Sequence, residues 1–368
     1  MAADIRTARA EDVDALVAIE NAVFEGDRIS RRSFRQLIDH ETAQARVADI
    51  NGRLAGYAMV LFRKGSGVAR LYSFAIAPDF SGKGIGRSLL DAAEHVAYEH
   101  GRMMLRLEVR QDNTRAIRLY EQNGYRRIGC EPDYYEDGMT ALRYEKTLRG
   151  DVPVATKVPF YAQTCDFTCG PCCLMMAMAN FDRGFVPDPV MEVRLWREAT
   201  TIFMMSGPGG CEPFGLAVAG HEAGLAAEIF VSAEGALFLQ SVRTAEKRRV
   251  MELAQADFRA RAEKYAIPVT YRPFTLDDIR AKLAEGKLVL VLISGFLMFG
   301  KKVPHWVLAI GDDGGHILIH DPWIEDEERE TASDAANIPV PYDIFMRMAQ
   351  FGRDGLRAAI TLGKLRKR

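Results

Sequence analysis

The chain has 368 residues, of which 48% are hydrophobic and 27% are charged. This composition is ordinary for a globular protein and excludes a disordered, collagen-like or coiled-coil chain. The 48 Lys and Arg residues are balanced by 50 Asp and Glu residues, so the basic excess of a nucleic-acid-binding protein is missing. At roughly 100–200 residues per domain, the length predicts two domains.

No segment of the sequence is expected to cross a membrane or to direct export. The longest uncharged apolar run covers residues 288–300, which is shorter than the roughly 20 residues of a spanning helix. The first residues, Met-Ala-Ala-Asp-Ile-Arg, lack the apolar core of a signal peptide. We therefore expect a cytoplasmic protein that contacts neither a membrane nor nucleic acid.

Strand and helix patterns alternate over residues 1–148, which predicts a first α/β domain. Apolar residues at helical spacing predict helices over residues 12–24, 87–100 and 114–123. Strands are predicted over residues 45–50, 54–62, 68–77, 103–109, 126–130 and 140–148. The polar segment 149–156 contains Gly and Pro without periodicity, and we predict that it is a linker.

A second α/β (α+β) domain is predicted over residues 157–368. An apolar helix is expected over residues 170–181, followed by a stretch that mixes loops and helices. Further helices are predicted over residues 214–224 and 276–285, and strands over residues 287–294, 304–310 and 316–321. His221, in the first of these later helices, is expected to be a packing or surface residue.

A glycine-rich turn connects the predicted strand 68–77 to the next helix. Gly82, Gly84 and Gly86 let the backbone approach a ligand closely. The N-terminus of the following helix offers unpaired N–H groups to an anion such as a pyrophosphate. Arg87 stands where a dinucleotide fingerprint needs its last glycine, and the ending of a Walker loop is missing. A plain tight turn is the alternative.

The residues beyond this turn carry a family resemblance. The segments Glu108-Val-Arg-Gln-Asp-Asn and Leu-Tyr120-Glu-Gln-Asn-Gly-Tyr, together with the turn, resemble the GCN5-related N-acetyltransferase (GNAT) family. The similarity covers about residues 4–148 and is to the RimI-like branch, whose members acetylate protein N-termini. It implies the GNAT mixed-sheet fold and acetyl-CoA as co-substrate. The residues that would border acetyl-CoA are Phe74, Ala75, Ile76, Ala77, Gly82, Lys83, Gly84, Gly86, Arg87 and Asn113.

The same resemblance implies two catalytic roles. Tyr120 would act as the general acid for the departing thiolate, and Glu108 would act as the general base. The chemistry agrees, because attack on a thioester needs a neutral amine and the leaving sulfur gains negative charge. A surface Glu and a packed Tyr are the alternatives. Ser81 departs from the Arg or Gln that usually begins the family's glycine motif.

Four of the six cysteines lie within residues 165–173. In a reducing cytoplasm such crowding indicates catalysis or metal binding rather than a disulfide framework. Cys169 stands at the start of the predicted helix, where the helix N-terminus stabilises a thiolate, so we predict that it is a nucleophile. The alternatives are a redox or zinc site at Cys169 and Cys172, or inert buried thiols.

We expect no metal, because the seven His residues do not supply a second ligand pair at regular spacing. The remaining cysteines, Cys130, Cys165, Cys173 and Cys211, are expected to be structural.

The partners of Cys169 are predicted from a hairpin. A loop centred on Asp313 would place His305 opposite Asp321, within hydrogen-bonding reach. The carboxylate would then orient the imidazole and stabilise its protonated form. Gln163 would supply a side-chain amide to an oxyanion hole beside the Cys169 N–H.

In this order, Gln163, Cys169-Gly, His305 and Asp321-Pro resemble the bacteriocin-processing cysteine peptidases, which are papain-like enzymes that cut leader peptides after Gly-Gly. The similarity covers about residues 157–323 and implies a papain-like fold and a peptide substrate. The two resemblances together predict a bifunctional enzyme that acts on a peptide or protein, with one acetylating site and one cutting site. An acetyltransferase whose second domain only binds peptide, and a non-catalytic peptide-binding adaptor, are the alternatives.

Overall fold

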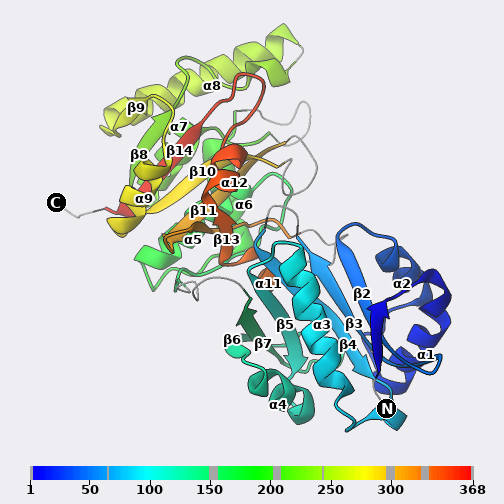
Figure 1. The fold of residues 1–368 in the computed structure, drawn as a ribbon. Coiled ribbons are helices and arrows are strands. Elements are labelled where there is room, and N and C mark those ends of the chain that lie inside the picture. Colours follow the sequence, from blue (N-terminus) through cyan, green and yellow to red (C-terminus); the bar gives the residue numbers. More distant parts are fainter. Residues whose placement is uncertain are drawn as a thin grey trace. The chain divides into compact units, whose positions relative to one another are not determined.

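The structure is a computed structural model that describes residues 3–63, 66–148, 156–201, 209–242, 244–295, 303–324 and 331–365. The chain divides into two compact units, Met1–Val152 and Pro153–Arg368. Within the described residues, each unit contains its own seven-stranded sheet, so both are mixed α/β structures (Figure 1). The predicted linker 149–156 lies outside the described residues except for Thr156.

The sheet of the first unit has the order β1-β2-β3-β4-β5-β7-β6 in the described chain. Its strands are β1 (Asp4–Thr7), β2 (Ala43–Ile50), β3 (Arg53–Phe62), β4 (Val68–Ile76), β5 (Met104–Arg110), β6 (Arg126–Glu131) and β7 (Ala141–Thr147). The helices are α1 (Val13–Val23), α2 (Arg31–Ile38), α3 (Ile85–Glu99) and α4 (Thr114–Gln122), with short 3-10 helices η1 (Ala10–Asp12) and η2 (Pro78–Phe80). The sequence patterns did not predict β1 and α2, which are short.

Helices cover both faces of this sheet, and each face has its own core. On one face, Leu16 and Ile19 of α1 and Phe34 of α2 pack against β2 and β3. On the other face, Leu89 and Leu90 of α3 belong to the core that contains β4 and β5 residues. The helical spacing of these apolar side chains therefore indicates correctly which face of each helix is buried.

β4 and β5 run parallel but separate partway along their length. Their pairing ends at Arg70 and Arg106, although β4 continues to Ile76 and β5 continues to Arg110. A bulge accompanies this change, because Met59 pairs with Ser73 while the next residue of β3 pairs with Leu71. Such a bulge bends a strand and increases its local twist. Beyond Arg70, the register in the described residues pairs β4 with β3 alone.

The sheet of the second unit has the order β13-β12-β11-β10-β14-β8-β9 in the described chain. Its strands are β8 (Leu225–Val231), β9 (Val269–Tyr271), β10 (Leu288–Ser294), β11 (Pro304–Asp312), β12 (His316–His320), β13 (Ile338–Pro341) and β14 (Ala358–Lys364). The helices are α5 (Cys169–Phe181), α6 (Pro189–Ala199), α7 (Pro213–Glu222), α8 (Ala245–Lys264), α9 (Leu276–Ala284), α11 (Ala332–Ala335) and α12 (Tyr342–Met348), with the 3-10 helix η3 (Leu239–Ser241).

The apolar helix α5 is buried along almost its whole length, as its composition predicts. It packs against β10, β11 and β14, and the core on this side also contains α7. The opposite face of the sheet packs against α9 and α12. Cys169 to Ala179 are all buried, and Asn180 and Phe181 at the C-terminal end are partly exposed.

The predicted register of the β11–β12 hairpin is wrong. Leu308 pairs with His320, and a bulge beside Ala309 then shifts the pairing toward the turn, so that Asp312 pairs with Ile317. The turn is therefore tighter than the loop we predicted around Asp313. The turn is the physical reason, because the Asp313 N–H donates to the His316 carbonyl oxygen over 3.2 Å, which leaves a two-residue loop and changes the partner of every residue in the hairpin.

Among the described residues, no helix is both long and apolar enough to cross a membrane.

Candidate active sites

The first candidate site begins at the turn between β4 and α3. Gly82 and Gly84 have φ angles of 77° and 80°, a backbone conformation that suits glycine and strains other residues. In the described structure, no heavy atom lies within 4 Å of the position that a Cβ would take at either glycine. Gly84 also precedes the first turn of α3. The turn therefore combines open space with the N–H groups of a helix N-terminus.

Three cationic side chains surround this turn. The Lys83 ammonium donates to the carbonyl oxygen of Asp79 over 2.9 Å, and Arg87 lies 3.4 Å from Asp91. Arg115 of α4 donates to the Ser81 hydroxyl over 3.0 Å. Arg115 was missed by the sequence analysis, and it brings a guanidinium to the position where the GNAT motif usually begins with Arg or Gln. The positive charge suits a pyrophosphate.

The other predicted cofactor residues lie at the separation of β4 and β5. Phe74, Ala75 and Ile76 belong to the part of β4 beyond the last residue paired with β5, and Ala77 follows it. Asn113 caps α4 by accepting a hydrogen bond of 3.1 Å from the Ala116 N–H.

Tyr120 is buried in α4 beside this part of β4. Its ring centroid lies 6.4 Å from that of Phe74, a residue predicted to border the cofactor. Burial raises the pKa of Tyr120, so the phenol keeps its proton at neutral pH. A protonated phenol can donate to a departing thiolate.

Glu108 is buried on β5, which excludes the alternative of a surface Glu. Its Oε2 lies 2.8 Å from Nε of Arg70, and both side chains are 5–6% exposed. Arg70 also donates to the Tyr134 hydroxyl over 2.7 Å. Arg70 therefore holds the Glu108 carboxylate and the Tyr134 hydroxyl close together. The sequence analysis missed Arg70 and Tyr134, because no local pattern relates β4 to β5 or to the loop after β6.

The second candidate site lies at the N-terminus of α5. Cys169 is the first residue of this helix and is 8% exposed. Thr168 stands at the N-cap, but its hydroxyl oxygen lies 2.8 Å from the Cys165 carbonyl oxygen and does not cap the helix. The first N–H groups of α5 are therefore left for another acceptor.

The structure brings His305 and Asp321 to Cys169. His305 Nε2 donates to Asp321 Oδ1 over 2.6 Å, and the Cys169 thiol is a further hydrogen-bond partner of the ring. Burial lowers the pKa of His305, but the negative charges of Asp321 and Cys169 outweigh it and raise the pKa to about 10. The imidazole is therefore protonated at neutral pH.

His305 and Asp321 are in contact, as predicted, although the strand register from which this contact was predicted is wrong. If the pairing of Leu308 with His320 continued, Asp321 would stand opposite Val307 rather than His305. Residues 305 and 307 share one face of β11. Asp321 is then a diagonal neighbour of His305, and such neighbours are still within reach of long side chains.

Gln163 lies on the segment that leads to Cys169 and beside the residue after Asp321. Its N–H donates to the Pro322 carbonyl oxygen over 2.9 Å. Its side-chain Nε2 donates to the Cys165 carbonyl oxygen over 2.8 Å, which uses one of the two amide hydrogens. The side-chain oxygen is buried and has no partner among the described residues.

The other cysteines differ in their surroundings. Burial raises the pKa of Cys172, Cys173 and Cys211, which keeps them as thiols. Cys165 is half-buried. Cys130 is exposed on β6. The described residues contain no group of three or more His, Cys, Asp or Glu side chains that could hold a metal ion.

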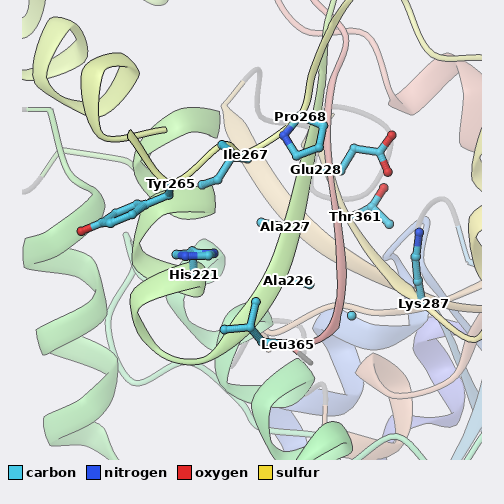
Figure 2. Close-up of a pocket in the computed structure, with 12 residues that line it drawn as sticks. His221, Ala226, Ala227, Glu228, Tyr265, Ile267, Pro268, Lys287, Thr361 and Leu365 are labelled. Atoms are coloured by element: carbon cyan, nitrogen blue, oxygen red, sulfur yellow. The ribbon is translucent and has the colours of Figure 1, made fainter. Parts of the chain in front are cut away.

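A separate cavity of about 330 Å³ lies at the end of β8 and β14 (Figure 2). His221 stacks on Tyr265 there with ring centroids 4.9 Å apart, as expected for a packing residue. None of the predicted catalytic or cofactor-binding residues lines this cavity.

Residues 158–363 match the Peptidase_C39 like family, and residues 6–148 match the acetyltransferase (GNAT) domain family. An N-alpha-acetyltransferase of Sulfurisphaera tokodaii is 30% identical over 152 residues, which covers 37% of this chain and 88% of that protein. The [ribosomal protein bS18]-alanine N-acetyltransferase of Salmonella typhimurium is 34% identical over 87 residues, 24% of this chain and 57% of that protein. Among solved structures, the ribosomal-protein-S18-alanine N-acetyltransferase from Escherichia coli has 25% identity and a TM-score of 0.37, covering 42% of this chain and 99% of that one.

Proposed function

Since the chain belongs to the Peptidase_C39 like family and also carries a GNAT acetyltransferase domain, we propose that it is an enzyme with two activities toward a peptide or protein. The first unit transfers an acetyl group from acetyl-CoA to an amine. The second unit hydrolyses a peptide bond with Cys169 as the nucleophile. The two relatives are named an N-alpha-acetyltransferase and a [ribosomal protein bS18]-alanine N-acetyltransferase, which favours an N-terminal amine as the acceptor.

The residues of the first unit fit acetyl-CoA, which supplies the reactive thioester. The turn from Gly82 to Arg87 would hold the pyrophosphate, with Lys83 and Arg115 as nearby cations. The β4 backbone beyond Arg70 is available to the pantetheine arm. Tyr120 donates a proton to the departing sulfur, and Glu108 accepts a proton from the acceptor amine, with or without an intervening water.

The second unit supports acyl transfer through a thiolate and an imidazolium. The Cys169 thiolate attacks the peptide carbonyl, and the Cys169 N–H and the Gln163 amide stabilise the oxyanion. His305 then gives its proton to the leaving amine, and it later takes one from the water that hydrolyses the acyl-enzyme. Asp321 holds the imidazole in place throughout.

The contact between His305 and Asp321 beside Cys169 carries the peptidase proposal. A peptide-binding fold without catalysis does not need this arrangement. We expect limited iodoacetamide treatment to alkylate Cys169 before the half-buried Cys165 and the exposed Cys130, because only Cys169 has an imidazolium partner. Peptide mapping measures the order of modification.

His305→Ala should slow alkylation of Cys169 because the thiolate loses its counter-charge. The hairpin offers a matched control in His316, whose Nδ1 lies 3.1 Å from Asp313. His316→Ala removes a similar His–Asp pair away from the thiol and should leave the alkylation rate unchanged. Modification of Cys165 or Cys130 while Cys169 stays intact would contradict the assignment of the nucleophile.

A further inference from the structure

A buried carboxylate of α6 contacts the segment that carries Gln163. Glu192 is 0% exposed and belongs to the buried side of α6, together with Leu195 and Ala199. Burying a charged group is costly unless hydrogen bonds compensate for the lost water. The partners of Glu192 are therefore informative about what the carboxylate does.

Four hydrogen bonds to this carboxylate come from residues 161–168, and the Cys172 thiol is a further partner. Oε1 accepts from the Thr164 N–H over 2.8 Å and from the Thr168 hydroxyl. Oε2 accepts from the Tyr161 hydroxyl over 3.1 Å and from the Thr164 hydroxyl over 2.9 Å. Each carboxylate oxygen thus binds two donors, which satisfies its acceptor capacity.

This segment has no helix or strand to define its shape, so side-chain hydrogen bonds must do so. Thr168 connects Glu192 to Cys165, because its hydroxyl donates to the Glu192 carboxylate and its backbone N–H donates to the Cys165 carbonyl oxygen over 3.2 Å. The same carbonyl oxygen accepts from the Gln163 amide over 2.8 Å. The carboxylate is therefore connected to the Gln163 side chain through two residues.

We propose that Glu192 is a positioning residue that holds the Gln163 amide beside Cys169, so that the oxyanion of the acylation step is stabilised. The proposal rests on the cysteine-peptidase chemistry proposed above. Glu192 acts through Thr168 and Cys165 rather than on the substrate. Burial and the charge of Glu192 also raise the pKa of Cys172, which leaves Cys169 as the nucleophile of the pair.

Stability alone is a weak explanation for this carboxylate. Replacing a buried ionic group by a well-packed apolar one is often neutral or stabilising. α6 already has its own N-cap in Asp188, whose carboxylate accepts from the N–H groups of Val190 and Met191, and it has apolar contacts through Leu195 and Ala199. A charged group whose donors lie within residues 161–172, on both sides of Cys169, fits a positioning role better.

Two thiol reagents separate positioning from general stability in the full-length protein. Iodoacetamide alkylates a thiolate by displacement at a saturated carbon and forms no oxyanion. With p-nitrophenyl acetate, the Cys169 thiolate forms a bond to the acetyl carbonyl, an oxyanion develops, and the bond to p-nitrophenolate breaks. Removing one oxyanion-hole donor costs about 10²–10³-fold. Cys169→Ala gives the background rate for both reagents.

We expect Glu192→Gln to slow acylation by p-nitrophenyl acetate by roughly 10-fold or more, with the alkylation rate unchanged. Gln163→Ala should slow acylation similarly. The double variant should acylate little more slowly than the Gln163 variant alone, because both changes act on the same stabilisation of the oxyanion by the Gln163 amide. Thr168→Val keeps the side-chain shape and removes the link, so it should reproduce the selective loss even if Glu192→Gln folds poorly.

Asp188→Ala is the matched control, because it weakens the start of the same helix without touching the segment. It should lower the melting temperature and leave the ratio of the two rates unchanged. The positioning role is overturned if the Glu192 and Thr168 variants acylate at the wild-type rate, or if both rates fall together. A wild-type Cys169 that reacts with neither reagent would overturn the peptidase proposal itself, and the role of Glu192 with it.

Discussion

Two neighbouring tyrosines of the first unit differ in their expected roles. Tyr120 and Tyr125 are both buried, with ring centroids 5.6 Å apart. Burial raises the pKa of Tyr120, so it remains a proton donor at neutral pH. We expect Tyr120→Phe to lower the acetyl-transfer rate by about 10²–10⁴-fold, with CoA affinity unchanged by calorimetry.

Tyr125→Phe is the control for the loss of a buried hydroxyl beside this site, and it should retain most of the activity. Equal rates for wild type and Tyr120→Phe would remove Tyr120 from the mechanism.

His305 links the second site to stability. Its pKa is raised in the folded chain to about 10, against about 6.5 for an unperturbed imidazole. Between about pH 6.5 and 10, the folded state binds a proton on His305 that the unfolded state has released. The contribution of this proton to the free energy of unfolding is therefore fully present below about pH 6.5 and is lost as the pH rises toward about 10. We expect the free energy of unfolding to fall more steeply over this range in wild type than in His305→Gln.

Tryptophan fluorescence during urea unfolding measures this difference selectively. All three tryptophans, Trp196, Trp306 and Trp323, lie in the second unit, so the signal reports that unit. If the free energy of unfolding has the same pH dependence in both proteins, Asp321 and Cys169 do not raise the pKa of His305.

At the scale of elements, the start of α3 is the most testable feature. Gly84→Glu would place a carboxylate at the proposed pyrophosphate site, and we expect it to abolish CoA binding in calorimetry. Gly101, after the end of the same helix, is a matched control, because it also has a positive φ, of 72°, and open space around a Cβ. Gly101→Glu introduces the same strain and charge, so loss of CoA binding in both variants would point to misfolding instead.

The elements themselves differ in how well the sequence predicts them. α5 is apolar on nearly every side and was predicted to within one residue of its start. β14 and β8 were missed, because each is buried along most of its length and rich in Ala or Gly, without the alternation that identifies a half-buried strand. β11 and β12 were predicted, but their register depends on a two-residue turn, where a longer loop was predicted, and on a bulge beside Ala309.

For the whole molecule, we expect the two activities to act on one peptide in the order cut, then acetylate. Hydrolysis creates a new α-amine, which is the acceptor class of the proposed acetyltransferase. A short linker, as predicted for residues 149–156, can raise the effective concentration of one product at the other site to about millimolar. Mass spectrometry of a cleaved peptide with acetyl-CoA should find the new N-terminus acetylated.

Two variants separate the steps of this sequence. Cys169→Ala should give neither the cut nor the acetylated new terminus, and Glu108→Gln should give the cut alone. If Cys169→Ala acetylates the intact peptide as fast as wild type acetylates the product, the two sites work independently.

Residues that are close in the chain were predictable, and contacts between distant elements were not. The glycine turn before α3 and Cys169 at the start of α5 follow from local patterns, because backbone conformation and helix ends depend on neighbouring residues. The pairing of Arg70 with Glu108, of Arg115 with Ser81, and of Glu192 with the segment before Cys169 depends on how strands and helices pack. The sequence thus identified the candidate reactive groups. Only the tertiary structure shows which charged side chains contact the residues around them, because a buried charge is stable only where distant elements bring hydrogen-bond partners to it.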